Sequence, residues 1–278
     1  MAKKLTDGFN KDFDNAEYHG DREYISSSGL KLILKNPREY YRKYVLNEQD
    51  SQNVAALSIG SYAHTRILEP HLVEKEYAIW TGGRRQGNAW KEFEEANKSL
   101  TILTDSQKSL VDSMVDKFNE TNVVLGGHGK EREVPLNTFF SDGRAEETGC
   151  VEINGVKVKV RFDYRKEFPV QGFGSINDLK TTGIALNNAT IEDVKEICDY
   201  WLYELSAALY VDVAEKLTGM PHDFYFCFLS KKDYAARIFK ASQGMIERGR
   251  QQYLEAIELL KVARKSGIYY SNKIEELP

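Results

Sequence analysis

The spacing of apolar residues predicts that the first half of the chain is mostly helical. A short helix begins at Ser26–Ser28 and is broken by Pro37, where a basic and aromatic second helix follows. Residues 54–68 form a mostly apolar run that predicts a buried helix, and helical periodicity returns through 87–125. Residues 1–24 alternate charged residues and glycine without such a period, which predicts a flexible N-terminal arm.

The pattern changes to short β-like segments after Gly129. Asn154-Gly155 is the strongest hairpin signal in the chain, because both residues tolerate the positive φ of a two-residue turn. A helix is then predicted over about 190–219, a strand at "DFYFCFLSK", and a long charged helix over about 241–265. This order predicts an α/β or α+β fold with a central mixed sheet, an antiparallel meander and flanking helices.

Composition restricts the class of protein. The chain has 278 residues, of which 41% are hydrophobic, so one large domain over residues 25–278 can bury its own core. It would comprise a helical part (25–128), a sheet (129–182) and C-terminal helices with a strand (183–278). The formal net charge of -4 excludes a generally basic nucleic-acid coat, so any DNA contact must be local.

Cysteine usage and hydropathy indicate a cytoplasmic protein. Cys150, Cys198 and Cys227 are odd in number and widely spaced, which supports neither a disulfide framework nor a zinc knuckle. No run of about 18 apolar residues could span a bilayer, and the N-terminus is too polar for a secretory signal. We therefore expect a reducing compartment and no membrane partner.

The hairpin turn fixes a register that brings two acids together. If Asn154-Gly155 is a two-residue loop, position 146 lies opposite position 163, with Cβ atoms about 4.5–5.5 Å apart. Glu146 and Asp163 would then be adjacent carboxylates. Two like charges this close are unfavourable unless a cation lies between them.

The next predicted strand, "GSINDLKTT", adds an acid and a base on one face. Asp178 and Lys180 are two positions apart, and side chains alternate between faces with a period of two. Several carboxylates in one place suit Mg²⁺, or Mn²⁺, better than zinc. A lysine beside such a metal can orient or deprotonate water and offset phosphate charge, so the chemistry indicated is phosphodiester hydrolysis.

These residues resemble a known nuclease signature. Asp163 followed by Asp178-Leu179-Lys180 is similar to the PD-(D/E)xK motif, with Phe162 where that motif has proline. Over residues 24–278, the stretches "ISSSGLKLILKNPREYYRKY", "GSYAHTRILEP", "RRQGNAWKEF", "VRFDY" and "NDLKTT" resemble, in this order, the phage and prophage exodeoxyribonuclease VIII family.

The resemblance implies a restriction-endonuclease-like core and a metal-dependent exonuclease. Such an enzyme degrades linear double-stranded DNA from the 5′ end and leaves a 3′ single strand for recombination in the bacterial host cytoplasm. The family acts beside a single-strand annealing protein. It is also similar to lambda exonuclease, which implies a homo-oligomeric ring, a trimer or a tetramer, around DNA.

The resemblance also implies roles for individual residues. Asp163 and Asp178 would be metal carboxylates, Lys180 the catalytic lysine, and His64 of "GSYAH" a ligand close to the metal. The backbone carbonyl of Leu179 would complete this set. Glu146 would supply a further catalytic and metal-binding acid.

Two other acids compete with Glu146. Glu133 lies in the preceding β-like segment, and a register slip of one residue would exchange Glu146 for Glu147.

DNA contacts are expected from two further segments. Arg84 and Arg85 could hold phosphates, with Trp90 stacking on an end base, although a solvated loop with Trp90 in the core fits the same pattern. Tyr203 and Tyr210 fall on the helix that carries a tyrosine, glutamine, tyrosine pattern in the family. Ser206 stands where the glutamine is expected, so the contacts of this helix are open.

Two rival interpretations fit the same residues. An endonuclease or structure-specific nuclease could use the same site, because these residues do not determine how DNA is presented. A non-catalytic phage DNA-binding protein with a decayed nuclease fold is the second rival, against which the retained Asp163, Asp178 and Lys180 argue.

Overall fold

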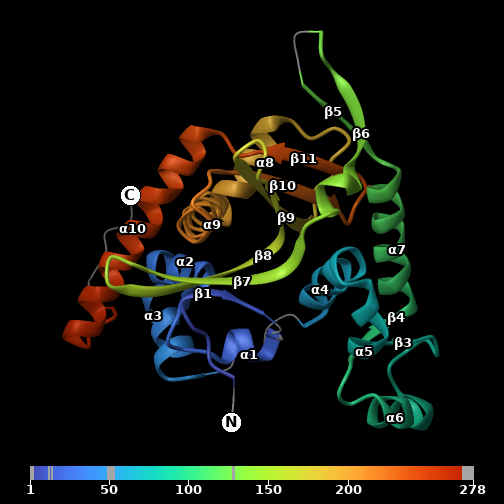
Figure 1. Cartoon of the computed structure of the whole chain (residues 1–278). Coiled ribbons are helices and arrows are strands. Elements are labelled where there is room, and N and C mark those ends of the chain that lie inside the picture. Colours follow the sequence, from blue (N-terminus) through green and yellow to red (C-terminus); the bar gives the residue numbers. More distant parts are fainter. Residues whose placement is uncertain (1–2, 12, 14, 49–53, 127–128, 271–278) are drawn as a thin grey trace, which may run out of the picture.

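The computed structural model describes residues 3–11, 13, 15–48, 54–126 and 129–270, and centres on a mixed sheet (Figure 1). Its strands follow the order β1-β7-β8-β9-β10-β11, and β2 pairs with β8 beside this path. The strands of this sheet are β1 (Gly8–Asn10), β2 (Ile25–Ser26), β7 (Arg144–Ile153), β8 (Val156–Phe168), β9 (Phe173–Thr182), β10 (His222–Ser230) and β11 (Ala236–Lys240).

The helices surround this sheet (Figure 1). They are α1 (Asn15–Gly20), α2 (Ser27–Lys35), α3 (Pro37–Tyr40), α4 (Val54–Leu68), α5 (Val73–Glu76), α6 (Gly87–Ala96), α7 (Asp105–Glu120), α8 (Ile191–Tyr200), α9 (Tyr203–Thr218) and α10 (Gln243–Ser266). The fold is therefore the predicted α/β arrangement, with an antiparallel meander of β7, β8 and β9 and a parallel pair of β9 and β10.

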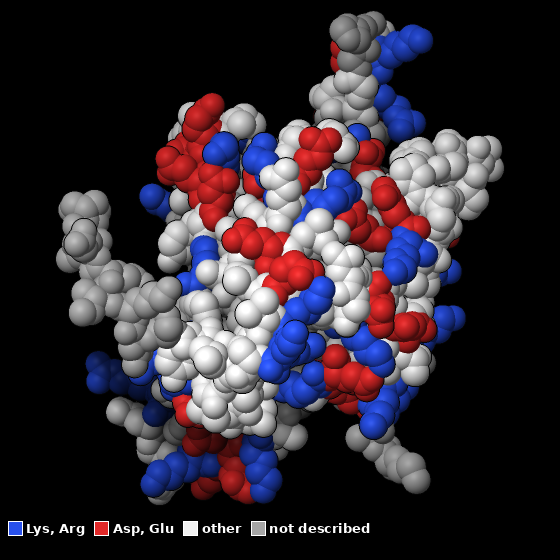
Figure 2. All heavy atoms as spheres, turned by 90° about the vertical axis from the view of Figure 1, so that its left-hand side faces the viewer, with Lys and Arg blue, Asp and Glu red and all other residues white. Residues whose placement is uncertain are grey.

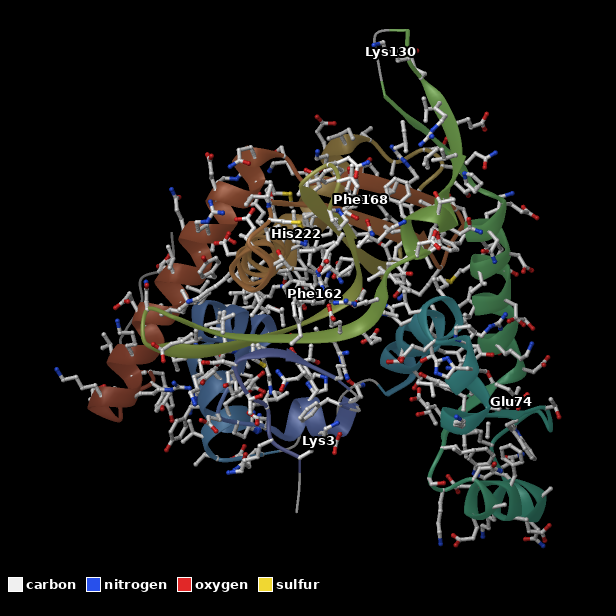
Figure 3. All side chains as sticks on the ribbon, in the orientation of Figure 1. Lys3, Glu74, Lys130, Phe162, Phe168 and His222 are labelled. Carbon is white, nitrogen blue, oxygen red and sulfur yellow. The ribbon has the colours of Figure 1, made fainter. Side chains whose placement is uncertain are left out.

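Two hydrophobic clusters lie against this sheet. One packs α2, α9 and α10 against the sheet and contains Phe162, which lies near the centre of the molecule (Figure 3). The other packs α4 and α7 around residues that include Leu179 and Cys227. Burial of apolar side chains in both clusters holds the strands between two layers of helices.

The β7–β8 hairpin has the register that its turn predicts. Ile153 pairs with Val156 across Asn154-Gly155, and both turn residues have positive φ, 49° and 79°. The pairing continues to Arg144 opposite Arg165, so the turn fixes the alignment over the whole hairpin.

The prediction of a flexible arm at residues 1–24 was wrong for most of that segment. Strand β1 pairs antiparallel with β7, and Leu5 and Phe13 are buried. The buried ammonium of Lys159 on β8 donates to the backbone carbonyls of Tyr18 and Asp21. These contacts are long-range, which explains why the local pattern did not reveal them. Residues 1–2, 12 and 14 of the arm, and 271–278 at the end of the predicted domain, lie outside the described residues.

The single helix predicted over 190–219 is instead two helices. It breaks between α8 and α9, where Leu202 adopts a left-handed conformation with φ of 48°. No glycine or proline marks this break in the sequence, and both α8 and α9 contribute buried residues to the main hydrophobic cluster. Tertiary packing therefore overrides the continuous helical pattern here.

Two small sheets lie outside the central one. Strands β3 (Tyr77–Trp80) and β4 (Thr101–Thr104) pair in parallel, and β5 (Asn122–Leu125) pairs antiparallel with β6 (Arg132–Pro135). The β5–β6 hairpin projects from the molecule, with Lys130 at its end (Figures 1 and 3).

The side of the molecule that carries α10 has no large patch of side chains with the same charge. Basic and acidic side chains are interspersed there (Figure 2), in keeping with the net charge of -4. In the part of the chain that is described, no helix is long and apolar enough to cross a membrane.

The contact between α9 and α10 requires a glycine. A Cβ added at Gly249 would lie 1.9 Å from the carbonyl oxygen of Glu204, so Gly249→Ala must separate the two helices. We expect a loss of about 1–3 kcal/mol in the free energy of unfolding, measured by denaturant titration. Gly244→Ala in the same helix is the control, because its nearest contact is a side-chain nitrogen at 3.6 Å; it should leave stability unchanged or slightly raised. Equal losses in both variants would contradict this account.

Candidate metal-dependent active site

The site lies at a fork in the sheet. Strand β7 occupies one edge of β8, and the other edge is shared: β2 pairs with Val158 and Lys159, whereas β9 pairs from Tyr164 onward. Residues 160–163 have no ladder partner on that second edge within the described chain. The chain turns from β2 into α2 at Ser27, while β9 continues to Thr182, so the two elements diverge around this gap.

Asp163 lies in the fork, and its side chain takes the place of the backbone acceptor that a continued β8–β9 ladder would provide. Its Oδ2 accepts the backbone N–H of Leu179 over 2.7 Å. Because the N–H and the C=O of a strand residue point to the same edge, the Leu179 carbonyl also faces the fork. The Lys180 ammonium lies 3.3 Å from that carbonyl oxygen. The backbone group predicted as a ligand is therefore directed toward Asp163.

Asp178, which is buried, forms an ion pair with the half-buried Lys180 beside this carbonyl. Nζ of Lys180 lies 2.5 Å from Oδ2 of Asp178 and 4.0 Å from Oδ2 of Asp163. Burial raises the pKa of Asp178, although the charge of Lys180 acts in the opposite direction. Burial lowers the pKa of Lys180, but the charges of Asp178 and Asp163 outweigh it, so the net pKa is raised. Lys180 is thus held as an ammonium.

Two further ligand groups, from His64 and Glu146, come close to Asp163. One ligand atom from each of His64, Glu146 and Asp163 lies within 4.8 Å of the others. His64 extends from α4, and its Nδ1 is 3.7 Å from Oδ2 of Asp163. A Cβ at Gly60, one turn earlier, would meet Thr181 Oγ1 at an ordinary 3.5 Å. Close packing here therefore does not require that glycine.

Glu146 reaches the cluster through a local distortion of β7. The pairing skips residues 146 and 163, although Ala145 with Tyr164 and Glu147 with Phe162 keep the register on either side. Glu146 itself has φ of 48°, in the left-handed region that non-glycine residues rarely adopt. Burial, and then the negative charge of Asp163, raise the pKa of Glu146 to about 8, while Arg161 acts to lower it.

The donor set fits a hard divalent metal. Oδ2 of Asp178 is buried, and its contact among the described residues is the Lys180 ammonium at 2.5 Å, so at least one lone pair of this oxygen remains for a cation. Carboxylates of Asp163, Asp178 and Glu146, with a backbone carbonyl, are the oxygen ligands that Mg²⁺ and Mn²⁺ prefer. The repulsion that raises the pKa of Glu146 is the repulsion that a bound cation would relieve.

The two alternatives to Glu146 lie elsewhere. Glu147 is buried in ion pairs with Arg165, at 2.6 Å, and with Arg144, at 3.1 Å. Its carboxylate is therefore occupied by structural partners. Glu133 is exposed on β6 in the projecting hairpin.

The tyrosines of α9 differ in their surroundings. Tyr203 is half-buried, and its ring centroid lies 5.6 Å from Nζ of Lys180, so it forms part of the wall of the site. Tyr210 instead packs against Phe162 and Phe224 in the core. Ser206, in the position where the family has glutamine, is buried as well. The placement of Tyr210 gives no support to a DNA contact.

The loop before α6 does not carry a free aromatic ring. Trp90 is buried against Trp80 and Phe93, so the expectation that it stacks on a base was wrong and the core interpretation holds. Arg84 is exposed, and Arg85 donates to the Ile102 carbonyl over 2.7 Å. In Figure 1 this part of the chain lies apart from β9, and phosphate binding by Arg84 and Arg85 stays a prediction.

Two residues near the site were missed in the sequence. Lys31 on α2 lies 5.0 Å from the ring centroid of Tyr203, on which Lys180 also rests. Burial, and then the charge of Lys180, lower the pKa of Lys31 to about 7. Glu69, just after α4, is close enough to raise the pKa of Glu146 further. The "GSYAHTRILEP" stretch contains Glu69, but no spacing rule distinguishes it from a surface acid.

Comparison with known proteins identifies the family. Residues 26–273 match a family model described as a PDDEXK-like domain of unknown function (DUF3799). The comparison with curated proteins finds no match.

Solved structures share the fold at low sequence identity. A crystal structure from Eubacterium rectale, described provisionally as an exonuclease, aligns with a TM-score of 0.64 and 15% identity, over 97% of this chain and 96% of that one. A second structure, SSO0001, aligns over 72% of this chain and 86% of its own with 11% identity, but its TM-score of 0.28 carries no argument. At these identities the likeness shows the fold alone.

Removing one charge from the fork should weaken metal binding without unfolding the protein. In Asp163→Asn the amide oxygen can still accept the Leu179 N–H, but the negative charge is lost. We expect affinity for Mn²⁺, measured by isothermal titration calorimetry, to fall by more than about tenfold. Asp116→Asn, at an exposed position on α7, is the control and should bind Mn²⁺ as the wild type does. Unchanged affinity in Asp163→Asn would exclude this cluster as the metal site.

Proposed function

Since the chain belongs to the family of PDDEXK-like domains, we propose that it is a Mg²⁺-dependent exodeoxyribonuclease that hydrolyses phosphodiester bonds of linear duplex DNA. One observation carries the proposal. Asp163, Asp178 and Lys180 converge at a fork in the sheet where His64 and Glu146 also reach Asp163. An ordinary ion pair between Asp178 and Lys180 would not need Asp163, His64 and Glu146 beside it.

The chain's own residues would prepare the phosphate for attack. Asp163, Asp178, Glu146, His64 and the Leu179 carbonyl would hold Mg²⁺, or Mn²⁺ in its place. When bound, the metal would polarise the scissile phosphate and lower the pKa of a bound water. Lys180, held as an ammonium 2.5 Å from Asp178, would orient that water and offset the negative charge that develops on the phosphate.

The surroundings keep these groups in place. The Leu179 N–H bond fixes the Asp163 carboxylate, and the Tyr203 ring limits the position of the Lys180 ammonium. Tyr203 in turn stacks on Phe226 of the neighbouring strand, with centroids 6.0 Å apart. Such fixed geometry reduces the reorganisation needed in the transition state.

Several finer properties of the proposal rest on the resemblance to exodeoxyribonuclease VIII enzymes. These are a 5′ to 3′ direction, production of 3′ single strands for phage-type recombination in a bacterial cytoplasm, a single-strand annealing partner, and a trimeric or tetrameric ring. Each is a separate expectation, and none is required for phosphodiester hydrolysis at the fork.

Digestion of DNA tests the proposal. Linear and covalently closed circular duplexes, labelled at the 5′ or the 3′ end where they are linear, are incubated with Mg²⁺ or with EDTA. We expect the wild type to degrade linear DNA only, to start at the 5′ end and to need the metal. Lys180→Ala should reduce the rate by about 10²-fold or more, the usual effect of losing a transition-state stabiliser.

A matched lysine controls for loss of charge. Lys117→Ala, on the exposed surface of α7, removes the same charge away from the fork and should cleave at the wild-type rate. Nicking of closed circles would replace the exonuclease by an endonuclease. Metal-independent DNA binding without cleavage in the wild type would instead support the decayed fold.

A further inference from the structure

Exposed aromatic rings continue from the wall of the active site to the surface. Tyr200 and Trp201, at the junction of α8 and α9, are 67% and 55% exposed, and their ring centroids are 4.9 Å apart. Tyr203, two positions later, is the ring on which Lys180 rests. We call Tyr200, Trp201 and Tyr203 the aromatic platform. Its outer rings are large hydrophobic surfaces in contact with water, which is unfavourable unless a partner covers them.

Two lysines of α2 lie on the same platform. Nζ of Lys31 is 5.0 Å from the centroid of Tyr203, and Nζ of Lys35 is 5.0 Å from the centroid of Tyr200. Positions four apart on a helix lie on one face, about 6 Å from each other. The side-chain nitrogens of Lys180, Lys31 and Lys35 therefore form a row that leads from the catalytic centre along the aromatic platform. Lys31, whose pKa burial lowers to about 7, is only partly charged at neutral pH until an anion lies beside it.

A cavity of about 550 Å³ adjoins the two exposed rings. Its walls include Ile184, Ala185, Asn188 and Ile197 beside Tyr200 and Trp201. This volume is in the usual range of small-molecule sites.

The polar groups of the cavity suit a base better than a phosphate. Asp193, Glu196 and Lys232 also line it, so two carboxylates and one ammonium face the cavity and its charge is negative on balance. The two carboxylates can accept hydrogen bonds from the exocyclic amines of nucleobases.

We propose that the aromatic platform and the lysines of α2 bind unpaired nucleotides of the DNA strand that enters the active site. Lys31 and Lys35 would contact its phosphates, and Tyr200 and Trp201 would stack on its bases. The strand must be unpaired there, because the faces of paired bases are already covered by their neighbours in the duplex. The proposal deepens the function proposed above and rests on it for the direction of the strand toward Lys180.

The charges favour DNA over a protein partner for this surface. A purely apolar interface would gain nothing from lysines placed beside the rings of Tyr200 and Tyr203. Rings that alternate with cations are the usual means of holding single strands without sequence preference. The row also begins at Lys180 itself, so the surface continues the site rather than forming a separate one.

Tryptophan fluorescence offers a direct test. The chain has three tryptophans, and Trp80 and Trp90 are each only 9% exposed. Binding of a short oligothymidine to the full-length protein in EDTA, where no metal is available for cleavage, should therefore quench Trp201 selectively. The Trp201→Phe protein should show little quenching. This readout is independent of catalysis, so it separates failure of this proposal from failure of the nuclease assignment.

Two variants then distinguish stacking of bases on the platform from nonspecific binding of the oligothymidine. Tyr200→Ala should weaken binding of the oligothymidine about 5- to 100-fold, the range for loss of one stacked base. Tyr270→Ala is the control, because Tyr270 is also exposed but contacts Tyr41 and Arg38 instead of the platform.

The salt dependence of binding tests the lysine contacts. Lys35→Ala should reduce the slope of log affinity against log salt by about 0.7, as expected for one lost phosphate contact with a single strand. Lys117→Ala should leave the slope unchanged.

Three results would overturn the proposal. The first is absence of quenching by oligothymidine, which would leave this surface to a protein partner. The second is an equal effect of Tyr200→Ala and Tyr270→Ala. The third is quenching by blunt duplex but not by single strands.

Discussion

The divergence of β8 from β9 at Asp163 is the constraint on which the site depends. Where the ladder opens, a strand N–H and a strand carbonyl would lack partners, and such groups are costly to leave unpaired when buried. The Asp163 carboxylate satisfies the N–H of Leu179. The backbone carbonyl of Leu179 then faces the gap, where it can coordinate a cation. One hydrogen bond thus orients both a side-chain and a backbone ligand.

The charged groups around the gap are largely removed from water. Asp178 is only 3% exposed. Among the described residues, its carboxylate forms an ion pair with Lys180 alone. On the other side, Asp163 and Glu146 repel each other, which contributes to the raised pKa of Glu146. A divalent cation would relieve this repulsion while leaving the Lys180 ammonium free to face a phosphate. The arrangement is therefore more consistent with a functional metal centre than with a structural salt bridge.

Much of this site was predictable because it depends on local rules. The Asn154-Gly155 turn fixed the hairpin register, and alternation along the strand placed Asp178 and Lys180 on one face. The left-handed conformation of Glu146 left no sequence signal, since the register is the same on either side of it. Its carboxylate nevertheless meets Asp163, because the two positions are opposite in the hairpin.

What the sequence did not reveal are contacts between distant segments. The N-terminal residues pair with β7 through β1, and the break at Leu202 follows from how α9 packs. Lys31 lies on a segment whose pattern predicts only a short helix. It reaches Tyr203 because the pairing of β2 with β8 places α2 beside the fork. Long-range pairing of this kind is set by tertiary packing, which a single sequence read locally does not contain.

The most direct test of the central claim is the position of a bound metal. Crystals of the protein soaked in Mn²⁺ would be measured for anomalous scattering at the manganese edge. The account predicts a peak in the fork, bonded to Asp163 and to at least one of Asp178, Glu146 and the Leu179 carbonyl. Manganese bound only elsewhere, or an empty fork at a Mn²⁺ concentration that supports DNA cleavage, would contradict it.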